Sequence, residues 1–235
     1  MRVALWTPTP DAEWVAALRA ELARALELVV VASEPLAPPP VELDIYHVAG
    51  SPAHGFVYRA LLRRAGVVLL AEWGLHALVH AETAGRGDAR AYRHEARRAH
   101  GDTGEFVARQ VLRGVGGALP ALVPLNQRVL DASLALVVLD AESRRRAAAL
   151  LPGRPVLQLP LDRPDAAGGA LRALVLEVAP RAEVERRELE ARAAQEGSLL
   201  GSALGELSWA ARELGLAEAP AESVPLVAAL FGGTR

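Results

Sequence analysis

The sequence has no cysteine and no lysine among its 235 residues. Without cysteine, the chain has no disulfide framework and no thiolate metal ligands, which suits the cytosol. Without lysine, it has neither a Schiff-base lysine nor the lysine of a phosphate-binding P-loop. Its 26 basic and 28 acidic residues nearly cancel, so no strong global field draws it to nucleic acid or anionic lipid. We therefore expect no nucleic-acid partner.

Long apolar runs are also missing. No uninterrupted apolar run reaches the roughly 18–20 residues that cross a bilayer, and the nearest one, over 114–125, contains two prolines. The short apolar run that precedes Pro8 has neither the length nor the small-residue cleavage site of an export signal. We expect a cytoplasmic protein without a transmembrane segment. With 51% hydrophobic residues, the chain has enough apolar material to fold.

What the sequence does contain is an alternation of short apolar runs and longer amphipathic stretches. The apolar runs predict strands at 3–6, 28–31, 44–48, 67–70, 134–139 and 156–159. The amphipathic stretches predict helices at 11–25, after 52, from about 73, over 86–114 as one long or two broken helices, and at 142–150. The runs do not alternate with polar residues, so we expect strands buried on both faces of a parallel sheet. This predicts a doubly wound, Rossmann-like α/β domain, whose site lies at the carboxyl ends of the strands.

The pattern changes after Leu161, so we expect a first domain over 1–161 and a linker with a C-terminal helical segment over 162–235. The linker is expected at 165–169, which is rich in alanine and glycine. Apolar residues between 200 and 214, four leucines and Ala211, then recur at alternating spacings of four and three, which predicts a helix seam that packs on its own domain or on another chain. A short last helix is expected at 224–231.

Three stretches of the first domain carry a resemblance to a known family. They read Tyr46-His-Val-Ala-Gly-Ser-Pro-Ala-His-Gly-Phe-Val-Tyr58, Gly66-Val-Val-Leu-Leu-Ala-Glu-Trp-Gly-Leu-His-Ala-Leu78 and Pro124-Leu-Asn-Gln-Arg-Val-Leu-Asp-Ala-Ser-Leu-Ala-Leu-Val-Val-Leu-Asp140. With their surroundings they cover roughly residues 1–160 and resemble the N-terminal domain of the family-four retaining glycosyltransferases, which have the GT-B fold. The resemblance implies an acceptor-binding domain, whereas the nucleotide-sugar of that family is bound by a second Rossmann-like domain.

The sequence departs from that family in two respects. The residues after Leu159 read as helices, so we expect the nucleotide-sugar half to be missing. The strand tips also differ, because the family usually has glycines after the first strand and Gly-Asn, His-Asp and His-Ser at later tips. Here 7–11 has no glycine, and the later tips read Ala49-Gly50, Ala71-Glu72 and Leu139-Asp140. A domain that keeps the frame and loses these tips is typical of a pseudoenzyme.

The resemblance implies five candidate site residues. Glu72 and His76 stand where the family has its catalytic strand-tip groups, and Ser51, His54 and Tyr58 stand at positions expected to bind the ligand. Each has a plainer alternative: Glu72 suits the N-terminus of a helix through the helix dipole, and His54 suits a packed, hydrogen-bonded position. At the start of a helix, His54 would otherwise add a donor for an anion.

A second group lies on a predicted helix. Arg90, His94 and Arg97 fall on one side of it and are candidates for binding a phosphorylated or lipid-linked acceptor, the alternative being a solvated basic face. Glu72, His76 and His80 are four residues apart, which is metal-ligand spacing in principle. No HExxH pattern accompanies them, so we expect no metal and no cofactor.

Two hypotheses of function follow. The first is a glycosyltransferase-like acceptor domain without its donor half, inactive alone, that binds a sugar or an anionic acceptor and pairs with a glycosyltransferase or a second copy of itself. The alternative is one chain of a split, retaining glycosyltransferase, whose partner chain binds the nucleotide-sugar. A third, unrelated Rossmann-like ligand-binding domain stays open. A dinucleotide ligand is disfavoured in that case, because no Gly-x-Gly-x-x-Gly follows the first strand.

Overall fold

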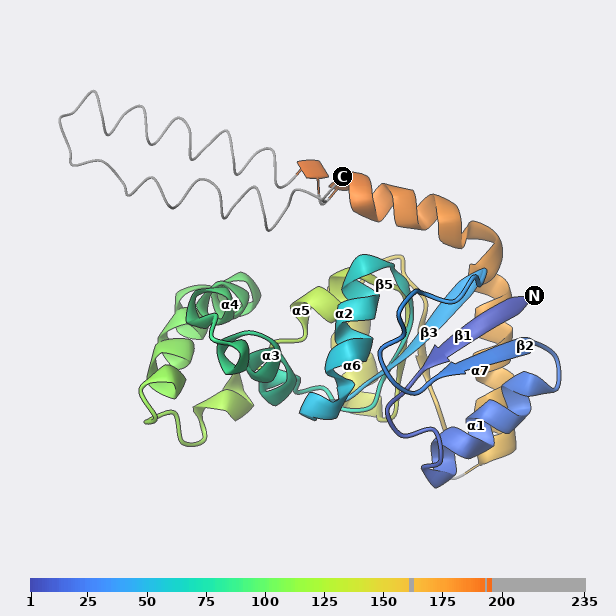
Figure 1. Cartoon of the computed structure of the whole chain (residues 1–235), viewed down its shortest axis with the longest axis horizontal. Coiled ribbons are helices and arrows are strands. Elements are labelled where there is room, and N and C mark those ends of the chain that lie inside the picture. Colours follow the sequence, from blue (N-terminus) through green and yellow to red (C-terminus); the bar gives the residue numbers. More distant parts are fainter. Residues whose placement is uncertain (161–162, 193, 196–235) are drawn as a thin grey trace. The chain divides into compact units, whose positions relative to one another are not determined.

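Six strands form one parallel sheet in the order β2-β1-β3-β4-β5-β6 (Figure 1). The computed structural model describes residues 1–160, 163–192 and 194–195. The strands are β1 (Arg2–Trp6), β2 (Glu27–Val31), β3 (Leu43–Val48), β4 (Gly66–Leu70), β5 (Ser133–Val138) and β6 (Val156–Gln158). The sequence-based prediction of a Rossmann-like α/β fold is confirmed.

Helices fill most of the connections. They are α1 (Glu13–Ala23), η1 (Pro52–His54), α2 (Gly55–Arg63), α3 (His76–Glu82), η2 (Ala84–Arg86), α4 (Ala89–Leu112), η3 (Leu119–Leu122), α5 (Gln127–Asp131), α6 (Ala141–Leu150), α7 (Pro164–Val178) and η4 (Ala179–Arg181). Helix α3 begins later than the expected position near Trp73. Helix α4 is broken, because His100 and Gly101 have non-helical backbone angles and Gly101 has a φ of 58°.

The prediction that every strand is buried on both faces is correct for the middle of the sheet and wrong at its edges. All residues of β3, β4 and β5 are buried. Strand β2 lies at one edge, where Val30 is 37% exposed, and the three residues of β6 at the other edge are half-buried. An edge strand has a neighbour on one side alone, so helices cover it incompletely.

The two faces of the sheet carry separate helices. On one face, Ala4, Tyr46, Val68 and Leu136 belong to a buried cluster with residues of α2, α3, α4 and α5. The alternate strand residues, such as Val3, are equally buried and point to the opposite face, because successive strand side chains alternate. There α1 and α7 pack on each other, side by side in Figure 1. Helix α1 is shorter than the expected range 11–25, and Ala25 lies beyond its end and is exposed.

The chain after β6 differs from the expected arrangement. Residues 165–169, expected as a linker, lie inside α7, which contacts α1 and β5. The compact unit that contains the sheet extends over Met1–Glu183, beyond the expected boundary at 161, and the described residues of the second unit, 184–192 and 194–195, are helical. The leucine seam at 200–214 and the helix at 224–231 lie outside the described residues. Over the described part of the chain, no helix is long and apolar enough to cross a membrane.

A buried ion pair ties the start of β3 to its neighbours. Asp44 is 1% exposed. It accepts hydrogen bonds from the Trp6 indole N–H at 2.8 Å and from Arg64 Nη1 at 2.7 Å. Arg64 also donates to the Val41 carbonyl, and its own carbonyl accepts the Tyr46 hydroxyl. The carboxylate is therefore compensated by donors from β1 and from the end of α2.

Replacing this carboxylate tests its contribution. We expect Asp44→Asn to lower the free energy of unfolding by about 2–3 kcal/mol, because the amide cannot neutralise Arg64 and presents donors to a donor. Urea unfolding measures the change. The matched control is Glu27→Gln, which alters an exposed pair with Arg2 and is expected to leave the midpoint nearly unchanged. Equal midpoints for the two variants would show that the buried pair contributes nothing.

Candidate functional site

The strand order places a topological switch point between β1 and β3. From β1 the chain proceeds to β2 on one side, and β3 then lies on the other side of β1. In open parallel sheets, ligands bind beyond the carboxyl ends of the strands at such a point, because the connecting loops diverge there. The residues that follow Trp6 and Val48 are therefore the first place to look for a site.

A buried histidine links the two strands at this point. His47 Nδ1 and Thr7 Oγ1 share a hydrogen bond of 2.8 Å, and Thr7 Oγ1 accepts the Thr9 N–H. The His47 ring stands edge-on against the rings of Trp14 and His54. Burial, with a smaller contribution from the neighbouring His54, lowers the pKa of His47 to about 3. His47 is thus neutral at physiological pH and anchors the loop after β1.

Three of the five strand-tip candidates gather at the end of β3. Glu72, which follows β4, is exposed and accepts the Gly50 N–H at 3.1 Å. A Cβ at Gly50 would lie 2.7 Å from Glu72 Oε2 and from the Gly74 carbonyl oxygen, so only glycine allows this approach. Ser51 accepts the Ala53 N–H and caps η1. His54 is buried and donates from Nδ1 to the His47 carbonyl at 2.9 Å.

The other two candidates lie inside the helical layer. His76 donates from Nδ1 to the Val123 carbonyl, and its Nε2 accepts the Tyr92 hydroxyl. It is buried, and burial is the main cause that lowers its pKa. Tyr58 is also buried, which raises its pKa above the ordinary range. His76 thus links α3 to α4 and to the Val123 carbonyl, with both ring nitrogens engaged away from Glu72, and Tyr58 belongs to the buried cluster that contains residues of α2, α3 and α4.

The basic residues of α4 form a separate surface. Arg90, His94 and Arg97 are exposed, and Arg97 forms ion pairs with Asp102 and Glu105. These carboxylates reduce the positive charge offered to an anionic acceptor. In the described part of the chain, no three His, Asp or Glu side chains are arranged to hold a metal ion.

A hollow of about 430 Å³ opens beside the switch point. Its lining comes from the carboxyl ends of three adjacent strands and from two helices. The lining residues are Pro8 after β1, Ala32, Ser33 and Glu34 after β2, Pro52, Ala53, Gly55, Phe56 and Arg59 from the η1–α2 segment, and Glu82 and Arg86 from the end of α3 and η2. This volume lies in the ~300–1,000 Å³ range of small-molecule sites.

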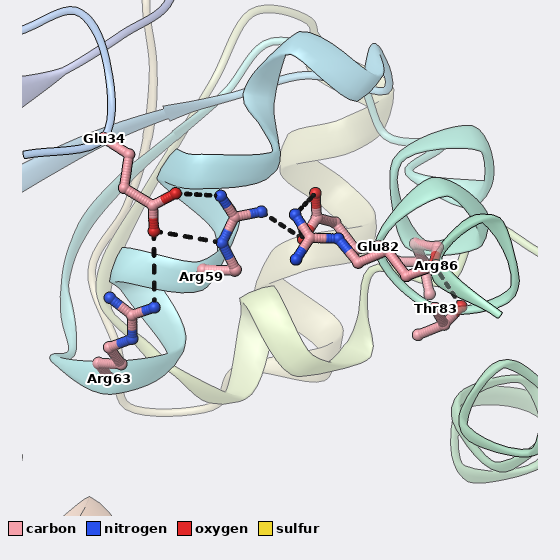
Figure 2. A network of polar contacts seen from close by, with 7 residues as sticks. Glu34, Arg59, Arg63, Glu82, Thr83 and Arg86 are labelled. Atoms are coloured by element: carbon pink, nitrogen blue, oxygen red, sulfur yellow. Dashed lines mark hydrogen bonds and ion pairs between the residues drawn. The ribbon is translucent and has the colours of Figure 1, made fainter. Parts of the chain in front are cut away.

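Four charged groups of the lining form one chain of ion pairs (Figure 2). Arg59 Nη2 lies 2.5 Å from Glu34 Oε2, and Arg59 Nη1 lies 2.5 Å from Glu82 Oε2. Arg86 reaches the same Glu82 carboxylate at 3.2 Å, and Arg63 reaches Glu34 at 3.6 Å. The hydrogen bond from Arg59 lowers the pKa of Glu34, and that from Glu34 raises the pKa of Arg59. Both groups are therefore charged at neutral pH.

Sequence reasoning missed this set. Glu34 stands three residues after a predicted strand, so the rule that sites follow strand ends could have identified it. Arg59 and Glu82 sit on helices and match no motif. They meet because Gly55 lets the start of α2 approach Glu82, since a Cβ at Gly55 would collide with Glu82 Oε1. No one-dimensional pattern encodes that approach.

The fold and the hollow define a Rossmann-like α/β domain with polar groups at the carboxyl edge of its sheet. Comparison with known protein families, curated proteins and solved structures finds no match to the chain. The class of protein is therefore given by the fold, and the function has to be argued from the site.

The buried His47 predicts a pH dependence of stability. The folded pKa of about 3 lies below the ordinary value of 6.5, so the unfolded chain binds a proton that the folded chain does not. The contribution of His47 to the free energy of unfolding is therefore fully present above its ordinary pKa. It decreases as the pH falls below that value, by at most about 1.4 kcal/mol per pH unit. His54 and His76, whose pKa values are also lowered, act in the same direction.

Urea unfolding between about pH 7.5 and 4.5 measures this slope. His47→Asn, which retains a polar group for Thr7 and does not titrate, is expected to flatten it. The control is His94→Asn on the exposed surface of α4, which is expected to retain the wild-type slope. Parallel curves for wild type and His47→Asn would show that His47 is not the titrating group.

Proposed function

We propose that the protein is a glycosyltransferase-like acceptor domain that binds a sugar-containing molecule at the carboxyl edge of its sheet and does not transfer sugar by itself. The observation that carries the proposal is the position of the hollow, which adjoins the switch point where Rossmann-like sheets bind their ligands. The resemblance of three stretches to the acceptor domain of family-four glycosyltransferases supports the sugar-containing ligand.

The side chains at this edge favour binding over catalysis. His47 and His54 are buried, and burial lowers the pKa of both, so neither ring is protonated to act as a general acid at neutral pH. His76 has both ring nitrogens engaged inside the helical layer. Glu72 is exposed, but its carboxylate already accepts the Gly50 N–H. It acts as a positioning group that holds the turn from which Pro52 and Ala53 line the hollow.

A split transferase is the second candidate, and the exposed Glu72 carboxylate favours it. Glu72 lies at the strand tip where the resemblance places an acidic group, and the same edge would face a donor domain supplied by another chain. The two candidates differ in one measurable respect. A split enzyme transfers sugar from a nucleotide-sugar when its partner chain is added, whereas a binding domain does not.

Calorimetric titration with UDP- and GDP-sugars, beside titration with sugar-containing acceptors, tests the proposal. We expect acceptor binding without nucleotide-sugar binding or turnover. Glu72→Gln is expected to weaken acceptor binding about five- to tenfold, because a weaker acceptor for the Gly50 N–H loosens the turn. Glu27→Gln is the control and is expected to bind as wild type does, because Glu27 lies at the amino end of β2, away from the carboxyl ends of the strands.

Two outcomes would contradict the proposal. Nucleotide-sugar binding with a stoichiometry near one, together with turnover by the chain, would establish an enzyme. Failure of every sugar-containing acceptor to bind would remove the sugar-binding function. Light scattering on the same samples reports whether a second copy takes part.

A further inference from the structure

The charged lining of the hollow indicates which class of ligand it can bind. The hollow lies between the ends of β1, β2 and β3 and helices α2 and α3. Its charged lining consists of two carboxylates, Glu34 and Glu82, and two guanidinium groups, Arg59 and Arg86. The formal charges cancel, and each group lies within ion-pair distance of another (Figure 2). The hollow therefore offers hydrogen-bonding groups of both kinds, and Arg63, which pairs with Glu34 from outside the lining, adds one positive charge at its margin.

This arrangement disfavours an anionic ligand. Arg59 is the central cation, and both of its sides are occupied by carboxylates at 2.5 Å. A phosphate that approached Arg59 would also approach two negative charges, and like charges at such distances repel strongly in a partly buried site. Arg59 is only 23% exposed and Glu82 only 10%, so water screens this repulsion incompletely.

A neutral ligand with several hydroxyl groups suits the same side chains. Arg59 carries five N–H donors, of which three donate to Glu34 and Glu82, so two lack a partner among the described residues. The Glu34 side chain is 47% exposed and keeps lone pairs open to a donor. Neighbouring hydroxyls of a sugar both donate and accept, so one ring can donate to Glu34 and accept from Arg59.

The uncharged part of the lining supplies the other half of sugar recognition. Phe56, Pro8 and Pro52 add apolar side chains to the lining, and the C–H face of a sugar ring packs on apolar and aromatic groups. Ser33 adds a hydroxyl at the rim. Phe56 also packs against the buried cluster of the domain, which fixes its position.

From this geometry we infer that the hollow binds one neutral sugar unit, with Glu34 and Arg59 recognising its hydroxyls and Phe56 supporting its ring. The inference rests on the proposed acceptor-binding function and names its ligand class. It separates the recognition site from the basic surface of α4, where Arg90, His94 and Arg97 lie.

The test compares neutral methyl glycosides of common hexoses with the corresponding 6-phosphates, by NMR titration of the ¹⁵N-labelled full chain. We expect the neutral glycosides to bind and to shift the amide signals of Ser33, Ala53 and Phe56, and the phosphates to bind more weakly. Glu34→Gln is expected to weaken neutral binding about tenfold or more, since it removes a charged acceptor. Phe56→Leu, which keeps an apolar side chain, is expected to weaken it severalfold.

Glu27→Gln and Glu72→Gln are the matched variants, because neither residue lines the hollow and neither forms an ion pair with a residue that does. Glu27→Gln is expected to bind as wild type does, and Glu72→Gln to show only the smaller loss expected from a looser turn. Thermal unfolding of each variant confirms that it is folded.

Three results would overturn the inference. Tighter binding of the 6-phosphates would show an anion site. Neutral binding unaffected by Glu34→Gln, with shifts elsewhere at the sheet edge, would place the sugar outside the hollow and leave the proposed function intact. The absence of binding by any methyl glycoside, with sugar-containing acceptors still bound in the calorimetric titration, would remove the hollow site and leave the proposed function intact, whereas the failure of both ligand sets would remove the two together.

Discussion

The reversal of strand order at β1 is the constraint on which the rest of the structure depends. All six strands are parallel, so all of their carboxyl ends meet at one edge. Because the chain goes to β2 on one side of β1 and to β3 on the other, the loops after β1, β2 and β3 diverge at that edge. The hollow lined by Pro8, Glu34 and Pro52 occupies the space that these loops leave. The strand order therefore determines where the hollow lies, and the side chains determine how it is lined.

The side chains then hold this edge in place. His47 joins β3 to the loop after β1 through Thr7, and Glu72 joins the loop after β4 to the turn after β3 through Gly50. Both contacts connect neighbouring strands at the same edge. Glu72 and Ser51, which were expected to contact a ligand, thus hold backbone turns at this edge. The side chains that line the hollow come from other positions in the sequence.

The ion-pair chain around Arg59 compensates a partly buried charge and leaves polar groups open to the hollow. An Arg between two carboxylates keeps its charge compensated, which a partly buried guanidinium requires. Its remaining donors and the exposed oxygens of Glu34 still reach the hollow. A cluster whose central Arg59 is already paired on both sides can hydrogen-bond a neutral ligand through these remaining groups. Arg97 differs from Arg59 in its exposure: it also pairs with acidic residues of its own helix, α4, but it faces solvent.

The sequence by itself determined the fold class, and three of its five candidates, Glu72, Ser51 and His54, lie together at the end of β3. Short non-alternating apolar runs such as 67–70 require burial on both faces, and helices between them allow only a covered parallel sheet. Local patterns also predicted that a helical turn begins after Ser51, and they left open whether 86–114 forms one helix or two, which the break at His100 and Gly101 decides. They failed at β2, where the edge position depends on strand order, and at 165–169, where packing on α1 stabilises a helix despite two glycines. Only the tertiary structure decided that His76 turns to Tyr92 and that Arg59 meets Glu34 and Glu82. Those partners lie far apart along the chain, and long-range packing, which no local periodicity records, brings them together.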